Sequence, residues 1–146
     1  MEHPPAVPQL FLTRLAKDDD LLQALTAFLD EHRIRQGSLS IIGALTHWAV
    51  GYWDGPAARY LVREGEGQAE ILHCAGNISI RDGAVFPHLH ITLAGPDYLA
   101  FGGHVCPGCR VFAAEVTVLA VQGPDLVREF DPATGLMLWP STRSGT

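Results

Sequence analysis

The sequence predicts a domain of the α+β class, in which one amphipathic helix accompanies a series of strands. Residues 20–35 carry apolar side chains at a helical spacing. Most other segments between residues 9 and 139 show the strand period of two or are rich in β-branched residues. Turn signals separate these segments, and the pair Asp82-Gly83 favours a tight hairpin between neighbouring strands. One helix and many extended segments joined by short turns indicate a domain built on a sheet.

The expected helix spans residues 20–35. Aspartates at positions 18–20 supply an N-cap and acidic charges for the first turn, where backbone amides lack partners. Arg33 and Arg35 suit the negative end of the helix dipole, and Gly37 is the expected stop. The apolar face consists of Leu21, Leu22, Leu25, Phe28 and Leu29. Packing explains this helix completely, so we expect no functional site on it.

The expected strands are short and closely spaced, except in one stretch. Residues 38–52 are strongly apolar but contain Gly43 and Gly51, which predicts either one long strand or two strands joined at a bulge. The polar run at residues 64–67 predicts a turn. The other expected strands cover residues 9–16, 58–63, 68–80, 88–93, 98–101, 110–121, 126–130 and 136–139.

The length of 146 residues suits one domain, which we place at residues 9–140. Three prolines within residues 1–8 predict an extended lead-in, and residues 141–146 are expected to form a mobile polar tail. The sequence has no apolar run long enough for a membrane span, and its N-terminus does not resemble a signal peptide. We therefore expect a cytoplasmic protein without a membrane partner.

The charge of the chain argues against direct binding to DNA. Its formal net charge is −6, and lysine occurs only once. The arginines are scattered, and only Arg33 and Arg35 lie close together. A protein that binds nucleic acid by itself usually has a basic patch that releases counterions from the phosphates. Direct DNA binding by a single chain is therefore not expected.

The strongest functional signal is a set of three histidines. His88 and His90 lie two residues apart in an expected strand, so their side chains leave the same face. A turn signal at residues 95–97 allows the chain to fold back and bring His104 to that face, and two glycines before His104 permit close approach of the strands. Three imidazoles with an open fourth position are typical of an accessible zinc site. The alternative is that these are ordinary histidines on the polar face of a strand.

The cysteines are a weaker signal. Cys74, Cys106 and Cys109 are too few for a disulfide framework. The motif Cys106-Pro107-Gly108-Cys109 has the spacing of half a zinc knuckle or of a redox pair. The sequence has no second C-x-x-C, and no expected helix follows that would lower a thiolate pKa. Three roles stay open: additional thiol ligands near His104, a redox pair, or two small residues at a hairpin.

Two polar residues in apolar strands are further candidates for ligand binding. Asn77 lies among apolar residues, so its amide needs hydrogen-bond partners, which either the protein or a ligand can provide. Glu115 is the one acidic residue in the expected strand over residues 110–121. A salt bridge is the simpler explanation for it, and a link to a metal-bound histidine is the alternative.

Taken together, the motifs resemble those of the PPC (plants and prokaryotes conserved) domain family in its stand-alone prokaryotic form. The resemblance runs from about residue 9 to residue 139, nearly the whole chain. Each motif is short, and their order and spacing make the collective match specific. The motifs are Ser40-Ile41-Ile42-Gly43-Ala44-Leu45, Gly51-Tyr52-Trp53-Asp54, Glu70-Ile71-Leu72, Gly76-Asn77-Ile78-Ser79, Asp82-Gly83, Pro87-His88-Leu89-His90, Phe101-Gly102-Gly103-His104 and Asp131-Pro132-Ala133-Thr134-Gly135-Leu136.

The resemblance implies a mainly antiparallel sheet of about seven strands with one principal helix, assembled as a homotrimer. It also implies that zinc can bind at the His-x-His and Gly-Gly-His positions, which are His88, His90 and His104 in this chain. In land plants the domain follows a basic AT-hook that reads the DNA minor groove, and this sequence contains no such segment. The cysteines at positions 106 and 109 depart from the pattern of the family.

These observations favour a homotrimer with about one zinc ion per chain, bound by His88, His90 and His104. The ion would bind a small ligand, or it would support hydrolysis by lowering the pKa of a bound water. The sequence contains no clear general base, so whether the protein is an enzyme stays open. One alternative is a DNA-associated regulatory protein that acts through the trimer or a partner. Another is an assembly module without ligand chemistry.

Overall fold

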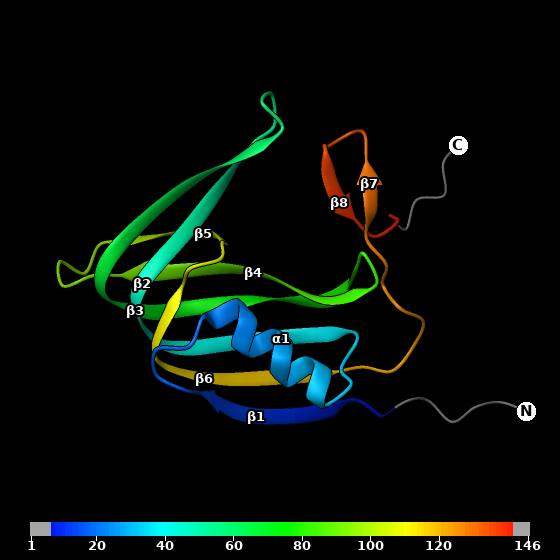
Figure 1. Ribbon diagram of the computed structural model, residues 1–146, viewed down its shortest axis with the longest axis horizontal. Helices are drawn as coiled ribbons and strands as arrows, with labels where there is room; N and C mark the ends of the chain where they lie inside the picture. Colours follow the sequence, from blue (N-terminus) through cyan, green and yellow to red (C-terminus); the bar gives the residue numbers. More distant parts are fainter. Residues whose placement is uncertain (1–6, 142–146) are drawn as a thin grey trace, which may run out of the picture.

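The computed structural model describes residues 7–141, which form one helix and eight strands (Figure 1). Six strands make one antiparallel sheet, and two form a separate small sheet, so the expected α+β class is confirmed. The predicted lead-in (residues 1–8) and tail (residues 141–146) lie almost entirely outside the described residues. The elements are β1 (Gln9–Leu15), α1 (Leu21–Glu31), β2 (Gly37–Asp54), β3 (Arg59–Arg81), β4 (Ala84–Ala94), β5 (Ala100–Val105), β6 (Arg110–Ala120), β7 (Glu129–Asp131) and β8 (Leu136–Leu138).

The main sheet has the strand order β1-β6-β2-β3-β4-β5. The distal part of β2 also pairs with β5, where Gly51 lies opposite His104, so strands β2 to β5 close into a ring. Towards their shared turn, β2 and β3 continue as a long hairpin arm (Figure 1). The ring holds the end of β5 against both β2 and β4, and this fixes the position of His104 in the sheet.

The helix α1 packs on one face of the sheet (Figure 1). It contributes three fully buried residues at helical spacing, Leu21, Leu25 and Leu29. Burying each leucine stabilises the fold by about 2 kcal/mol. Phe11 of β1 points to the same side and meets Phe28 of α1 edge to face, with ring centroids 6.2 Å apart. The residues that alternate with Phe11 point to the opposite face of the sheet, which α1 does not cover.

The helix begins where the sequence predicts and ends earlier. Asp20 is the N-cap, and its side chain accepts a hydrogen bond of 3.0 Å from a backbone N–H in the first turn. The predicted continuation to residue 35 is wrong, because Arg33 adopts a left-handed conformation with φ of 55° that stops the helix. Gly37 therefore begins β2 and does not cap α1. With 11 residues, α1 is too short to cross a membrane, and residues 7–141 contain no other helix.

β3 runs without a break through residues 64–67, so the turn expected there is wrong. Gly65 packs beneath the indole of Trp48, where any Cβ would collide with the ring. Gly67 has a φ of 112° and lies at a bulge, where two residues of β3, Gly67 and Gln68, face one residue of β2, Thr46. These glycines therefore serve close packing and the bulge. β2 is also one continuous strand with two register shifts, the first of the two predicted alternatives.

The C-terminal segment differs from the predicted edge strand over residues 126–130. In this segment Val127 makes an isolated bridge to Ile80 of β3, while β7 pairs with β8 in its own hairpin. The hairpin stands beside the β2–β3 arm (Figure 1), and the indole N–H of Trp53 donates a hydrogen bond of 3.3 Å to the carbonyl of Thr134. The β7–β8 hairpin therefore borders the open face of the sheet instead of extending its edge.

Candidate metal centre

β4 carries His88 and His90 on one face of the sheet, as the strand period of two requires. It pairs antiparallel with β3 after the tight turn at Asp82-Gly83, where both residues have positive φ. Asn77 lies directly opposite His88 in this pairing. The prediction that the Asn77 strand and the histidine strand are neighbours is therefore confirmed.

β5 brings the third histidine to the same place. The chain reverses after β4, and the pairing of β4 with β5 sets His104 directly opposite His90. The two glycines before His104 make this possible. A Cβ on Gly102 would collide with the carbonyl oxygen of Ile91, and one on Gly103 would lie 2.6 Å from the nearest carbonyl oxygen of β2. Both glycines are therefore needed for close approach of neighbouring strands, as the sequence predicts.

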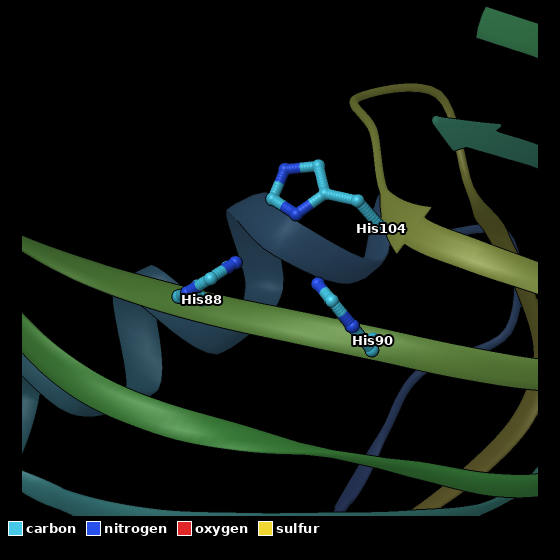
Figure 2. Close-up of side chains that lie close together, drawn as sticks. All are labelled: His88, His90 and His104. Carbon is cyan, nitrogen blue, oxygen red and sulfur yellow. The ribbon is translucent and has the colours of Figure 1, made fainter. Parts of the chain in front are cut away.

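The three imidazole rings converge on one space (Figure 2). One ring nitrogen from each of His88, His90 and His104 lies within 4.8 Å of the other two. Tetrahedral zinc sites with zinc–nitrogen bonds of about 2.0–2.1 Å separate the nitrogens by about 3.3 Å, so modest side-chain rotations would complete the coordination. Residues 7–141 contain no other group of three or more metal-binding side chains arranged in this way.

Two of the rings are held in the neutral form that metal binding requires. Burial of the ring, together with the positive charge of Arg128, lowers the pKa of His88 to about 4. Burial also lowers the pKa of His104 to about 4, with further contributions from His90 and Arg128. Each ring therefore keeps one unprotonated nitrogen at neutral pH, and such a nitrogen can donate its lone pair to a cation.

Nδ1 of His104 is buried and has no hydrogen-bond partner among the described residues. Leaving a buried polar atom unpaired costs roughly 1–3 kcal/mol, so such atoms are rare in folded proteins. Tyr60 stacks on the same ring, with centroids 4.5 Å apart and planes 17° from parallel, and so fixes its orientation. A neutral, buried and unpaired nitrogen beside two other imidazoles fits a bound metal ion.

The site includes a fourth residue that sequence analysis missed. Arg128 is only 5% exposed, and its Nη2 donates to Nδ1 of His88 over 3.2 Å. The guanidinium also donates to Oγ of Ser79 (2.7 Å), Oδ1 of Asn77 (2.9 Å) and the carbonyl of Met137 (2.9 Å). The one hint in the sequence is an arginine that follows two apolar residues. Its role is visible only when β3, β4 and β8 are brought together.

The contact with Arg128 selects one tautomer of His88. Arginine has hydrogen-bond donors and no acceptor, so Nδ1 of His88 must accept and the proton of the neutral ring lies on Nε2. A metal ion binds only an unprotonated nitrogen. An ion on Nε2 of His88 would have to replace this proton, and an ion on Nδ1 would displace Arg128. Metal uptake and the position of Arg128 are therefore coupled.

Of the two further candidates, one lies at the site and the other does not. Asn77 is next to His88 in the sheet, and its amide oxygen accepts a hydrogen bond from Arg128. Glu115 lies on β6, which β2 and β3 separate from β4. Its exposed side chain is opposite Arg14 of β1. The alternative role considered for Glu115, a link to a metal-bound histidine, does not fit this position.

The thiols of Cys106 and Cys109 are not part of the histidine cluster. Both side chains are buried. The Cys106 thiol donates a hydrogen bond to the carbonyl of His104 (3.7 Å), and the Cys109 thiol contacts the backbone N–H and carbonyl of Ala49 at 3.4 Å. Burial raises the pKa of Cys109 to about 11, and it also raises the pKa of Cys106. Their surroundings are those of structural thiols.

The family of the chain follows from a comparison over most of its length. The family model of the Plants and Prokaryotes Conserved (PCC) domain matches residues 3–122. The chain belongs to this family. It is the family, abbreviated PPC above, that the sequence motifs resemble. The matched region contains all three histidines and ends before Arg128, so the conserved domain and the C-terminal hairpin meet at the site.

Solved structures of similar proteins confirm the fold. A metal-containing protein from Archaeoglobus fulgidus is 37% identical, with 97% of this chain and 100% of that chain covered and a TM-score of 0.88. A plant- and prokaryote-conserved (PPC) protein from Pyrococcus horikoshii is 27% identical, with 99% and 100% covered and a TM-score of 0.89. A "putative dna binding protein" from Bacteroides thetaiotaomicron is 26% identical, with 96% and 100% covered and a TM-score of 0.82.

Curated relatives are longer proteins. The "Bifunctional protein GlmU" of Synechococcus sp. (strain JA-2-3B'a(2-13)) is 31% identical over 137 residues, which is 92% of this chain and 20% of that protein. The protein of the same name from strain JA-3-3Ab is 30% identical over 131 residues, with 88% and 20% covered. This chain therefore spans about a fifth of the length of the curated relatives it matches.

Proposed function

We propose that this protein is a zinc-binding homotrimer, in which His88, His90 and His104 hold one ion per chain and leave a fourth position open for a small ligand. The observation that carries this proposal is the buried, unpartnered Nδ1 of His104 within the cluster. A set of three imidazole ligands suits zinc, whereas magnesium and calcium prefer oxygen ligands. The metal-containing relative from Archaeoglobus fulgidus supports a metal at this fold.

Ligand binding is better supported than catalysis. A zinc ion here would act as a Lewis acid on its fourth ligand. Tyr60 would orient the ring of His104 through the stacking contact described above. Hydrolysis also needs a group that accepts a proton from the attacking water. No carboxylate is among the described residues that line the cavity beside His88 and His104.

Elemental analysis of untagged protein, purified without chelators, tests the metal. We expect about one zinc per chain in the wild type and almost none in His90→Ala, because two imidazoles alone hold zinc weakly. His73→Ala is a matched control, since His73 is another exposed histidine on the neighbouring strand β3 and is not part of the cluster. Wild-type protein that neither contains zinc nor takes it up from solution would contradict the proposal.

The open face of the sheet supports the homotrimer. Residues that lie opposite one another on neighbouring strands have their side chains on the same face of the sheet. A row of such residues, followed from strand to strand, therefore gives the side chains of that face. Two such rows begin at Leu10 and Leu12 of β1, which are 65% and 75% exposed, and end at the histidines. Exposed leucines on a face that also carries a candidate site are typical of an interface. The rows are Leu10-Leu119-Ser38-Asn77-His88 and Leu12-Thr117-Ser40-Ala75-His90-His104.

The mass in solution tests the assembly. Three chains of 15.8 kDa give 3 × 15.8 = 47.4 kDa, which light scattering after size-exclusion chromatography would measure. We expect Leu12→Glu to shift the protein towards monomer, because a charge would then be buried in the interface. Leu61→Glu, on the β2–β3 arm and also exposed, is the control and should leave the mass unchanged. A monomeric wild type would contradict the trimer.

The alternative of a DNA-associated protein is favoured by the name of the Bacteroides thetaiotaomicron relative. The net charge of −6 opposes it, since contacts to phosphates need positive side chains. An electrophoretic mobility shift assay at low salt with random duplex DNA tests this alternative. No shift at micromolar protein is expected, and a shift would favour the alternative.

A further inference from the structure

A cavity of about 270 Å³ lies between the β7–β8 hairpin, the β2–β3 arm and the sheet. His88 and His104 line it, so it opens directly onto two of the three candidate metal ligands. Its volume is near the lower end of the range for small-molecule sites. The cavity therefore suits a molecule of a few heavy atoms that also reaches the metal position.

The charge of this cavity is positive although the chain is acidic overall. Arg81 and Arg128 both line it, and no aspartate or glutamate is among the described lining residues. The donors of Arg128 are largely occupied by its four protein contacts, so this arginine supplies mainly positive potential. Arg81 is less committed. Among the described residues its one ion pair is a 3.6 Å contact with Asp82, whose side chain is 80% exposed, and its own side chain is 43% exposed. The guanidinium also lies over the ring of Phe86, 5.3 Å from the centroid.

Tyr60 offers the second free donor. Its ring is fixed by stacking on His104, and its hydroxyl has no hydrogen-bond partner among the described residues. A phenol is protonated at neutral pH, so this hydroxyl can donate a hydrogen bond. A phenol and a guanidinium that line the same cavity as His88 and His104 can both donate hydrogen bonds to an anion bound there.

The remaining walls are apolar and are held in place. Trp53 and Phe86 contribute aromatic surfaces, and Leu136 and Leu138 come from β8. The hairpin that carries these leucines is tied to the sheet by the hydrogen bond from Arg128 to Met137 and to the arm by the bond from Trp53. The cavity is therefore preformed, and its walls suit a short apolar body attached to the anionic group.

We propose that this cavity binds a small organic carboxylate, whose one oxygen takes the open position of the metal while the other accepts hydrogen bonds from Arg81 and Tyr60. A carboxylate is the simplest anion that can reach the metal position through one oxygen and accept hydrogen bonds from Arg81 and Tyr60 through the other. Its short apolar part lies against Phe86 and the β8 leucines. The contact with the metal rests on the proposed function. The contacts with Arg81 and Tyr60 do not, and the two can be tested separately.

Isothermal titration of zinc-loaded protein with acetate, propionate and benzoate tests this proposal. We expect millimolar or tighter binding of at least one of them, and no binding of the neutral propionamide. Arg81→Gln should weaken binding at least about tenfold and Tyr60→Phe about threefold, as expected for lost hydrogen bonds to a charged group. Arg63→Gln, an exposed arginine on the same strand outside the cavity, is the control for the change in net charge and should have no effect. The melting temperature of each variant confirms that it is folded.

The outcomes separate this proposal from the metal proposal. Zinc-loaded protein that binds none of the three carboxylates, or binds them equally well in Arg81→Gln, overturns the cavity proposal and leaves the metal site intact. If the wild type holds no zinc and propionate still binds in an Arg81-dependent way, the metal proposal fails and the anion site stands. Binding that weakens both on zinc removal and in Arg81→Gln supports the two together.

Discussion

Two neighbouring regions of this molecule carry motifs that sequence analysis associates with metals, and the fold treats them differently. The histidines at positions 88, 90 and 104 meet on the open face of the sheet, and the buried Nδ1 of His104 has no hydrogen-bond partner within residues 7–141. The cysteines at positions 106 and 109 follow immediately in the sequence, yet they are buried and make weak contacts with the backbone. Spacing alone therefore does not single out candidate metal ligands; the convergence of ring nitrogens in the fold does.

The largest expected effect is on metal binding. His104→Ala should weaken zinc binding by at least about a hundredfold, because it removes one of three ligands from the cluster. Cys109→Ser should leave zinc binding unchanged within about twofold, since the thiol lies outside the cluster. Competition with a chromophoric chelator measures both affinities. Equal losses in the two variants would remove the distinction between the regions.

The second effect concerns the approach of β5 to β4. Gly102→Ala should destabilise the protein by about 3 kcal/mol, because its Cβ would meet the backbone carbonyl of Ile91. Gly55→Ala is the control, since nothing lies within 4 Å of its Cβ and its cost should stay within about 0.5 kcal/mol. Urea unfolding gives both values. A harmless Gly102→Ala would show that β5 does not need this close contact to present His104.

The third effect tests the cysteines directly. Burial raises the pKa of Cys109 from 9.0 to about 11 and that of Cys74 to about 12. Near pH 8 the thiolate fraction of Cys109 is therefore about a hundredfold lower than that of an unburied thiol. Alkylation of Cys74 and Cys109 by iodoacetamide should therefore be at least about a hundredfold slower in the native protein than in urea. Rapid native labelling of Cys109 would indicate the reactive thiol of a redox pair.

The smallest expected effect separates a buried cation from an exposed one. Arg128→Gln should lower the free energy of unfolding by about 2 kcal/mol, because it leaves Ser79, Asn77 and the carbonyl of Met137 with fewer hydrogen-bond partners in a buried site. Arg35→Gln removes an exposed bidentate pair with Asp125 and should cost less than about 1 kcal/mol. Chemical denaturation measures both. A larger cost for Arg35 would contradict the assigned role of Arg128 in anchoring β8.

The histidine cluster was predictable because local rules determine it. The period of two places His88 and His90 together, and the turn after β4 with two glycines places His104 opposite them. Arg128 was not predictable in this way. Its partners lie on β3, β4 and β8, and no pattern in the sequence around it indicates a buried cation. Long-range packing, which no local period encodes, brings these groups together.

Of the wrong expectations about the fold, the turn at residues 64–67 has the same origin. Gly65 and Gly67 have the composition of a turn, but a neighbouring indole and a bulge require them inside a continuous strand. The helix ends at a left-handed Arg33, although arginine has no local preference for that conformation. At the two glycines tertiary contacts overrode the local signal, whereas at Arg33 the helix end is closed by local backbone hydrogen bonds from Arg33 to Asp30 and from Ile34 to Leu29. The Asp20 N-cap and the Asp82-Gly83 hairpin are local features and were predicted correctly.

X-ray absorption spectroscopy at the zinc edge of the purified protein tests the central claim most directly, because it identifies the ligand atoms and their distances. The account predicts three nitrogen ligands at about 2.0–2.1 Å, one further light atom, and no sulfur. A sulfur shell at about 2.3 Å would assign the ion to the cysteines, and the absence of bound zinc in protein supplied with it would contradict the three-histidine site altogether.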